Sequence, residues 1–363
     1  MVCARIACST VPDGAARADR RPGGAGDVSG RSPGLSAVIP VLPPLEALLD
    51  RLYVVALPMR VRFRGITTRE VALIEGPAGW GEFGAFVEYQ SAQACAWLAS
   101  AIETAYCAPP PVRRDRVPIN ATVPAVAAAQ VGEVLARFPG ARTAKVKVAE
   151  PGQSLADDIE RVNAVRELVP MVRVDANGGW GVAEAVAAAA ALTADGPLEY
   201  LEQPCATVAE LAELRRRVDV PIAADESIRK AEDPLAVVRA QAADIAVLKV
   251  APLGGISALL DIAARIAVPV VVSSALDSAV GIAAGLTAAA ALPELDHACG
   301  LGTGGLFEED VAEPAAPVDG FLAVARTTPD PARLQALGAP PQRRQWWIDR
   351  VKACYSLLVP SFG

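Results

Sequence analysis

Beyond about residue 111, short apolar or β-branched runs alternate with alanine-rich helical stretches. Between consecutive runs lies one segment of helical pattern, such as GVAEAVAAAAALTA at 181–194. Strands that alternate with single helices indicate parallel βαβ units, and about eight such units favour a closed barrel over a doubly wound open sheet. No GxGxxG follows the first run to support a dinucleotide site in an open sheet. The runs begin near Ile119, Ala144, Met171, Leu198, Pro221, Asp244, Val268 and His297.

The pattern is mixed rather than repetitive between residues 39 and 110. LYVVALPM (52–59) and TTREVALIEGPAGWGEFGA (67–85) predict strands joined by turns, and SAQACAWLASAIETAYC (91–107) predicts a helix. We therefore expect a small α+β domain at 39–110, followed by the barrel at 111–317. Residues 318–363 leave the repeat and are expected to return to the small domain, ending in an amphipathic helix at 342–359.

Residues 1–38 are rich in glycine, alanine, arginine, serine and proline, and they show no apolar period. This composition predicts a disordered extension. The segment lacks the apolar core of a secretory signal, so we expect a cytoplasmic protein.

Composition narrows the classes of function. The chain has 363 residues and a formal net charge of −7, without a long run of lysine or arginine, which disfavours a nucleic-acid partner. The longest apolar region, roughly 255–293, is interrupted by Asp261, Arg265 and Asp277, so it does not predict a membrane span. The seven cysteines show neither a CxxC pair nor a zinc-type spacing. The sequence makes no prediction of the oligomeric state.

The stretch GARTAKVKVAE (140–150) places two lysines on one face of a predicted strand. Side chains alternate with period two, so Lys145 and Lys147 point one way, while Val146 and Val148 point the other. Burial of an ammonium group is costly unless an anion compensates it. The pair therefore indicates a nearby anion or a chemical purpose.

Three carboxylates stand at the ends of the next three predicted strands. Asp175 ends MVRVD, Glu202 ends LEYLE, and Asp225 follows PIAA, each one βα unit after the last. The carboxyl ends of parallel strands meet at one end of a barrel, where barrel enzymes place their catalytic groups. Oxygen ligands without histidine or cysteine suit Mg²⁺ or Mn²⁺ better than zinc. Each acid alone would also be an ordinary helix N-cap, but three at strand ends favour a metal site.

Lys249 ends the sixth predicted strand, so it would face Lys147 across the barrel mouth with the metal between them. This arrangement suits abstraction of a proton next to a carboxylate, because a divalent cation stabilises the resulting enolate. The base must be neutral near pH 7, far below the ordinary lysine pKa of ~10.4. Lys145 supplies like-charge repulsion that lowers the pKa of Lys147. We expect Lys147 to be the base, since His297 is the only histidine.

Other polar residues lie near the predicted strand ends. Glu226 is turned away from Asp225 by alternation, so we expect it beside the metal ligands rather than among them. Asn177 either shapes the NGG turn or faces the metal. Four residues either contact substrate or serve only the backbone of their loops: Ser273, Ser274, Gly302 and Thr303.

These motifs together resemble the muconate-lactonizing subgroup of the enolase superfamily. The matching features are the KxK pair, DAN at 175–177, EQP at 202–204, DES at 225–227 and LK at 248–249, and the resemblance covers about 39–335. It implies a modified (β/α)7β TIM-type barrel with an α+β capping domain. It also implies Mg²⁺ held by Asp175, Glu202 and Asp225.

Several longer stretches, including VRVDANGGW and GLGTGGLF, are most similar to members that form 2-succinylbenzoate in menaquinone biosynthesis. The resemblance implies syn dehydration of 2-succinyl-6-hydroxy-2,4-cyclohexadiene-1-carboxylate, a small dicarboxylate. Lys147 would remove the α-proton and then help hydroxide leave, while Lys249 would stay charged and stabilise the enediolate. Arg173 matches a family position near the site.

The resemblance also implies that capping-domain loops cover the substrate. These would lie near 59–65 and 84–89 in this chain. The first of them carries three arginines that are candidates to attract a dianion: Arg60, Arg62 and Arg64.

Racemisation of N-succinylamino acids, or another racemase or cycloisomerase reaction of the subgroup, is the main alternative, because Lys147 and Lys249 would supply both acid and base. Dipeptide epimerases carry an acidic DxD on strand eight, where this chain has GLGTGG. Mandelate-type members need a histidine on strand seven, and VVVSSALDS has none. A barrel that binds metal or a partner without catalysis would have no need for buried ammonium groups.

Overall fold

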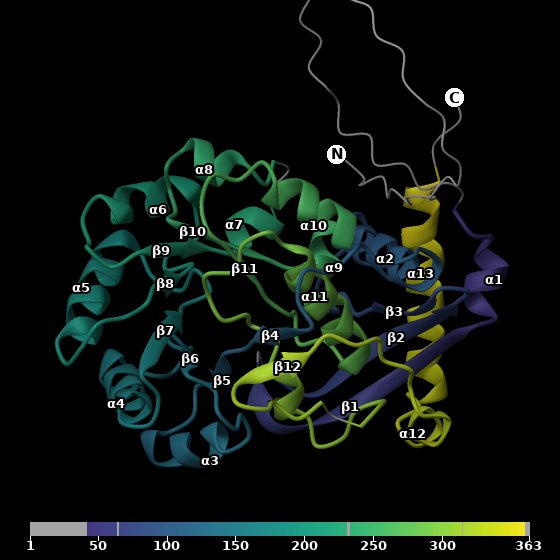
Figure 1. Cartoon of the computed structure of the whole chain (residues 1–363), viewed down its shortest axis with the longest axis horizontal. Coiled ribbons are helices and arrows are strands. Elements are labelled where there is room, and N and C mark those ends of the chain that lie inside the picture. The colour runs from purple at the N-terminus through teal and green to yellow at the C-terminus, as the bar shows by residue number, and fades with distance from the viewer. Residues whose placement is uncertain (1–41, 64, 231–232, 314, 360–363) are drawn as a thin grey trace, which may run out of the picture.

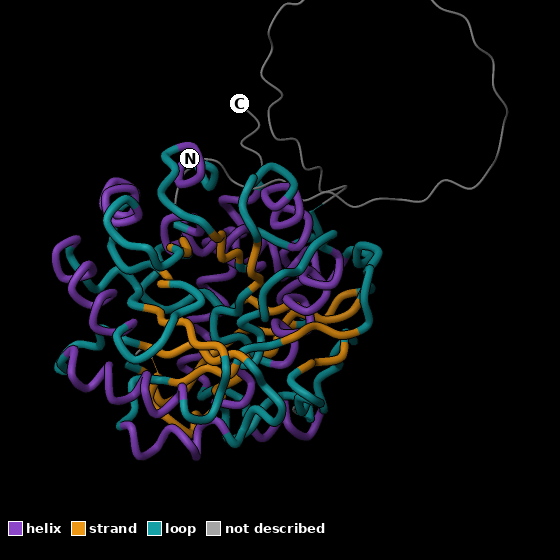
Figure 2. The backbone as a smooth tube through the Cα atoms, turned by 60° about the vertical axis from the view of Figure 1, so that its left-hand side comes forward, coloured by secondary structure: helices purple, strands orange, loops and turns teal. Residues whose placement is uncertain are grey.

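The computed structural model describes residues 42–63, 65–230, 233–313 and 315–359 (Figure 1). The predicted extension at 1–38 and Arg64 lie outside the described residues. Figure 2 shows the strands in the interior and most helices on the outside. No helix in the described ranges combines the length and the apolar character needed to cross a bilayer.

The small domain contains an antiparallel sheet in the order β1-β2-β3. Its strands are β1 (Leu52–Phe63), β2 (Ile66–Gly76) and β3 (Gly79–Phe83), preceded by the short helix α1 (Leu45–Leu49). Helix α2 (Ser91–Tyr106) packs on β2 and β3 through a buried face that includes Trp97, Leu98 and Ile102. The strands and the helix predicted for this region are confirmed.

Seven parallel strands form the second sheet, in the order β11-β10-β9-β8-β7-β6-β5. Ile119 pairs with Cys299 and Ser273 pairs with Gly300 in single parallel bridges, which close the sheet through an eighth position. The predicted eighth strand is therefore reduced to a few bridging residues. The strands are β5 (Ala121–Val123), β6 (Thr143–Lys147), β7 (Met171–Asp175), β8 (Leu201–Glu202), β9 (Ile222–Ala224), β10 (Ile245–Leu248) and β11 (Val270–Val272).

A helical connection follows each of these seven strands, and α3 to α8 lie around the outside of β5 to β9 (Figure 1). Ser154 and Thr207 cap α4 and α6, because their side chains accept hydrogen bonds from the backbone N–H groups of Asp157 and Glu210. The predicted (β/α)7β order is confirmed. The helices are η1 (Ala128–Gln130), α3 (Val131–Leu135), α4 (Leu155–Arg166), α5 (Val182–Thr193), α6 (Val208–Arg215), α7 (Glu226–Arg229), α8 (Ala236–Arg239), α9 (Val250–Leu253), α10 (Ile256–Ala263) and α11 (Ala279–Ala291).

The last part of the chain returns to the small domain. After η2 (Thr303–Leu306), β12 (Phe321–Ala323) pairs antiparallel with β4 (Arg116–Pro118). Helices α12 (Pro331–Ala336) and α13 (Pro341–Leu358) follow, and α13 packs on α1 and α2. Trp347 of α13 is fully buried against Phe83, and its indole N–H donates to Glu70. This contact ties the terminal helix to the small domain.

Candidate active site

The register of the parallel sheet brings the predicted site residues to one end of the barrel. Lys147 pairs with Asp175, and Asp175 pairs with Glu202, as direct neighbours on β6, β7 and β8. Asp225 follows β9 directly, and Lys249 follows β10. Because these strands run parallel, all five residues lie at their carboxyl ends.

Each carboxylate is paired with an ammonium group. Lys145 Nζ donates to Glu202 Oε1 at 2.7 Å and lies 3.3 Å from Asp175 Oδ2. Lys147 Nζ donates to Asp175 Oδ2 at 2.5 Å, and Lys249 Nζ donates to Asp225 Oδ2 at 2.6 Å. The three carboxylates are at most 1% exposed. The anions that the KxK pair requires are therefore Asp175 and Glu202.

The two lysines of the KxK pair have opposite pKa shifts. Burial lowers the pKa of Lys147, Lys145 acts in the same direction, and Asp175 only partly offsets them. Burial would also lower the pKa of Lys145, but Glu202 and Asp175 raise it above its ordinary value. Lys145 therefore stays charged, whereas Lys147 is shifted toward the neutral form that a base requires.

The three carboxylates also differ in the direction of their pKa shifts. Burial and the carboxylate of Asp175 raise the pKa of Glu202 to about 7, against the opposing effect of Lys145. For Asp175, burial is outweighed by Lys147 and Lys145, so its pKa is held well below the ordinary range. For Asp225, burial is outweighed by Lys249 and Arg229, with the same result.

The donor set fits a hard divalent cation. In the described part of the chain, no group of three or more His, Cys, Asp or Glu side chains is arranged to hold an ion jointly, and the carboxylates instead bind the amines. Glu202 Oε2 is buried and has no hydrogen-bond partner among the described residues. Such an orphaned oxygen beside two more buried carboxylates is suited to a cation that prefers oxygen ligands.

The lysines open into a small inner cavity of about 30 Å³. Phe63 and Phe86 of the small domain line it from one side. From the barrel, it is lined by Thr122, Lys145, Lys147, Asp175, Asn177, Lys249, Ser273, Ser274, Ala275, Leu276, Gly300 and Thr303. Because Lys147 and Lys249 line the same cavity, a single bound molecule can reach both.

A larger outer cavity of about 730 Å³ adjoins the inner one. Phe63, Lys147 and Asn177 line both cavities, and Arg62 and Glu150 line only the outer one. A substrate with two ends can therefore place one end at the lysines and the other beside Arg62.

Asn177 and Glu226 lie beside the carboxylates. Asn177 Oδ1 accepts from Lys147 Nζ at 2.6 Å, and its amide donates to Glu226 Oε1 at 3.2 Å. The φ of Asn177 is 48°, so it also forms the turn after β7. Asn177 therefore shapes the turn, and its side chain contacts Lys147 and Glu226. Ser274 and Thr303 share a hydrogen bond of 2.7 Å at the inner cavity.

Arg173 does not line the inner cavity, but it lies near the site as expected: it pairs with Lys145 in the strand register, is fully buried, and donates to Glu199 and to the Tyr200 hydroxyl. Two candidate substrate contacts, Gly302 and Arg60, lie elsewhere. Gly302 lines a different groove, and a Cβ at this position would come within 2.9 Å of the Asn120 carbonyl, so its small size serves packing. Arg60 donates to the Phe307 carbonyl at 2.8 Å and lines that same groove rather than the outer cavity.

Gln203 positions the site but was not predicted from the sequence. It is fully buried, and its Oε1 accepts from the backbone N–H groups of Asp225 and Ser227. Its place in the EQP motif was the available signal. The aromatic residues Phe63 and Phe86 were also missed, although they lie within the two loops predicted to cover the substrate.

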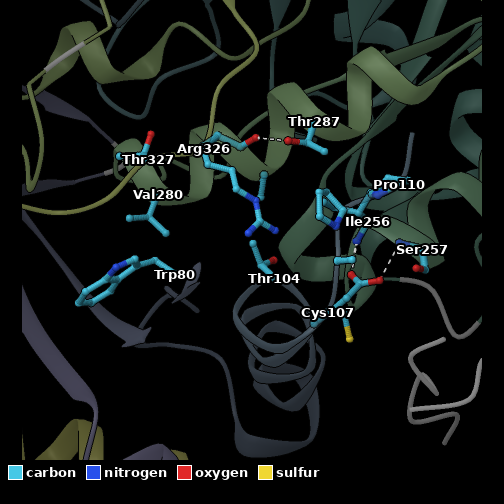
Figure 3. A pocket seen from close by; sticks show the side chains of 15 residues that line it. Trp80, Thr104, Cys107, Pro110, Ile256, Ser257, Val280, Thr287, Arg326 and Thr327 are labelled. Atoms are coloured by element: carbon cyan, nitrogen blue, oxygen red, sulfur yellow. Dashed lines mark hydrogen bonds between the residues drawn. The ribbon is translucent and has the colours of Figure 1, made fainter. Parts of the chain in front are cut away.

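A separate pocket of about 90 Å³ lies between α2 and the barrel helices α10 and α11 (Figure 3). Figure 3 shows the Arg326 side chain extending into it toward Thr104, with Trp80 to the left. Of the described residues that line it, none is one of the three carboxylates or of the site lysines. This pocket is therefore distinct from the candidate active site.

Comparisons with known proteins agree with this architecture. Residues 127–329 match the family model "Enolase C-terminal domain-like", and residues 54–105 match "Enolase N-terminal domain-like". Among solved structures, muconate lactonizing enzyme from Pseudomonas putida is 22% identical with a TM-score of 0.65, and the match covers 79% of this chain and 98% of that one. At this identity the likeness shows the fold alone.

Closely similar relatives share one name, o-succinylbenzoate synthase. The relative from Mycobacterium marinum is 81% identical over 90% of this chain and 100% of its own length. The relative from Mycobacterium leprae is 79% identical over 89% of this chain and 97% of its own, and that from Thermobifida fusca is 51% identical over 85% and 98%. This chain therefore belongs to the enolase superfamily and, within it, to the family of the o-succinylbenzoate synthases.

Proposed function

We propose that this protein is a lyase that dehydrates 2-succinyl-6-hydroxy-2,4-cyclohexadiene-1-carboxylate to 2-succinylbenzoate in menaquinone biosynthesis. The observation that carries the proposal is the joint presence of Lys147 and Lys249 in one cavity beside three buried carboxylates. The names of relatives that are 77% to 81% identical support the same reaction.

Asp175, Glu202 and Asp225 would hold Mg²⁺, or Mn²⁺ in its place. When bound, the ion supplies positive charge that stabilises negative charge developing on the substrate carboxylate. Lys145 remains charged beside Glu202 and so holds that carboxylate in place. Asn177 accepts a hydrogen bond from Lys147 and so fixes the direction of the amine.

The chemical steps need one residue to move a proton twice. Neutral Lys147 takes the proton from the ring carbon that bears the carboxylate, and the electrons of that C–H bond form the enediolate. The C–O bond at the neighbouring ring carbon then breaks, and the Lys147 ammonium returns its proton to the departing hydroxide. A new ring double bond and one water are formed, so the product is aromatic. Lys249 stays charged throughout and stabilises the enediolate.

The outer cavity would take the succinyl arm. Arg62 and Lys147 both line this cavity, whereas Arg60 is bound to backbone carbonyls outside it. We assign Arg62 to the second carboxylate of the substrate, because a guanidinium group binds carboxylates well.

Purified protein incubated with the cyclohexadiene substrate and Mg²⁺ tests the function. We expect an ultraviolet absorbance change as the aromatic product forms. An absorbance that stays constant with intact cyclohexadiene substrate would contradict the proposal. A polarimetric assay with an N-succinylamino acid, run in parallel, tests the racemase alternative, which the presence of two lysines in one cavity also permits.

A further inference from the structure

Arg229 joins the site to the small domain through a single guanidinium group. Its Nε donates to Asp225 Oδ1 at 3.0 Å, and its Nη2 donates to Glu226. Its Nη1 donates to the hydroxyl of Tyr89, a residue of the small domain, at 2.6 Å. The Arg229 side chain is only 3% exposed, so water competes little for these bonds.

Tyr89 ends the segment of residues 84–89, which we call the cap segment. Arg350 of α13 donates to the carbonyls of Phe86 and Tyr89, each at 2.7 Å. The ring of Tyr89 packs edge-on against Phe86 and Trp97. Phe86 lines the inner cavity. Tyr89, which accepts the hydrogen bond from Arg229, therefore belongs to the segment that covers the site.

The carboxylate of Asp225 is held from both of its oxygens. Lys249 Nζ binds Oδ2 and Arg229 Nε binds Oδ1, so rotation of the carboxylate would break one of the two bonds. A guanidinium group is a planar fork, and the direction of one N–H therefore limits the directions of the others. Movement of Tyr89 would turn the fork and with it the orientation of Asp225.

We propose that Arg229 and Tyr89 are positioning residues that couple the cap segment to the metal carboxylate Asp225. Binding of a divalent cation and ordering of the cap segment then stabilise each other, because such coupling is reciprocal. Relative to the proposed function, the inference rests only on the assignment of Asp225 as a metal ligand.

Mn²⁺ binding to the full-length protein, followed by electron paramagnetic resonance without substrate, tests the coupling. Outer-shell partners typically change metal affinity by about 10- to 100-fold, so we expect a loss in this range for Arg229→Gln. Tyr89→Phe removes one hydroxyl a step further away, and we expect about threefold to tenfold weaker binding. Tyr355→Phe is the matched control, because its hydroxyl donates to the Pro43 carbonyl away from the site.

Tyr89→Phe decides the outcome even if Arg229→Gln fails to fold. Unchanged Mn²⁺ affinity in Tyr89→Phe, or an equal loss in Tyr355→Phe, would overturn the coupling. In the unaltered protein, Mn²⁺ should slow amide hydrogen exchange in residues 84–89, and Tyr89→Phe should reduce this protection. Exchange that Mn²⁺ does not affect would also overturn it. Neither readout involves the dehydration reaction, so failure of the proposed function would be seen separately, as an absence of product from protein that binds Mn²⁺.

Discussion

Lys145 and Lys147 carry the same ammonium group on the same strand, yet their surroundings assign them different tasks. Glu202 and Asp175 raise the pKa of Lys145, so this lysine keeps its proton. Burial and the charge of Lys145 lower the pKa of Lys147, so this lysine loses its proton more easily. Strand alternation predicts that both lysines share one face, and the structure confirms this, since both line the inner cavity. Alternation alone does not distinguish the two, because the difference comes from carboxylates on β7 and β8.

Lys147→Ala should lower kcat for dehydration by about 10²- to 10⁴-fold, the usual contribution of a general acid–base residue. Circular dichroism should show an unchanged fold. Lys352→Ala removes a half-exposed lysine from α13 and should leave kcat unchanged. A Lys147→Ala enzyme with the unaltered rate would show that another group is the base.

Arg62→Gln should raise KM for the dianionic substrate about tenfold, the effect of one lost hydrogen bond to a charged group, with a much smaller change in kcat. The matched control is Arg60→Gln, on the same strand but outside the cavity. Steady-state kinetics give KM and kcat for both variants. Equal KM values for the two variants would mean that Arg62 does not bind the succinyl carboxylate.

At the scale of single elements, the start of α11 depends on an acid from the small domain. Glu82 of β3 accepts hydrogen bonds from the backbone N–H groups of Ser278 and Gly281. Burial raises the pKa of Glu82 to about 8, and the carboxylate of Asp277 acts in the same direction. The folded protein therefore keeps a proton on Glu82 that the unfolded chain loses above its ordinary pKa of 4.5.

This shift predicts a loss of stability as pH rises. Between pH 5 and pH 8 the free energy of unfolding should fall by about 3–4 kcal/mol more in the unaltered protein than in Glu82→Gln, which mimics the protonated side chain. Urea unfolding across this pH range measures the difference. Parallel pH profiles for the two proteins would contradict the raised pKa.

Helix α13 is the element that secures the return of the chain to the small domain. Trp347→Ala removes a side chain with no exposed surface and should lower the free energy of unfolding by about 3–5 kcal/mol. Trp346 is only half-buried, so Trp346→Ala should cost less. Urea denaturation of both variants measures the ranking, and a larger loss for Trp346→Ala would show that the packing is misassigned.

For the whole molecule, the barrel, its chemical end and the loops that cap it could be predicted, but not which side chains of those loops reach the cavity. The repeat of strand and helix locates Asp175, Glu202, Asp225 and Lys249 at strand ends, because each is placed by its own βα unit. Phe63 reaches the cavity from a distant strand, and no local periodicity encodes that approach.

The arginines of residues 59–65 also show that local alternation does not predict which cavity a side chain reaches. Arg60 and Arg62 have the same alternation, yet they line different cavities. The pairing of β1 with β2 shifts register between Pro58 and Phe63, so alternation no longer predicts direction there. The eighth strand is likewise reduced to single bridges on either side of residues 299–300.

The Lys147 chemistry that we propose depends on a divalent cation held by the buried carboxylates at the strand ends. The most direct measurement is the dehydration rate of one enzyme preparation before treatment with EDTA, after it, and after Mg²⁺ is restored. We expect loss of turnover on chelation and recovery with Mg²⁺. Turnover that continues unchanged in EDTA would contradict it.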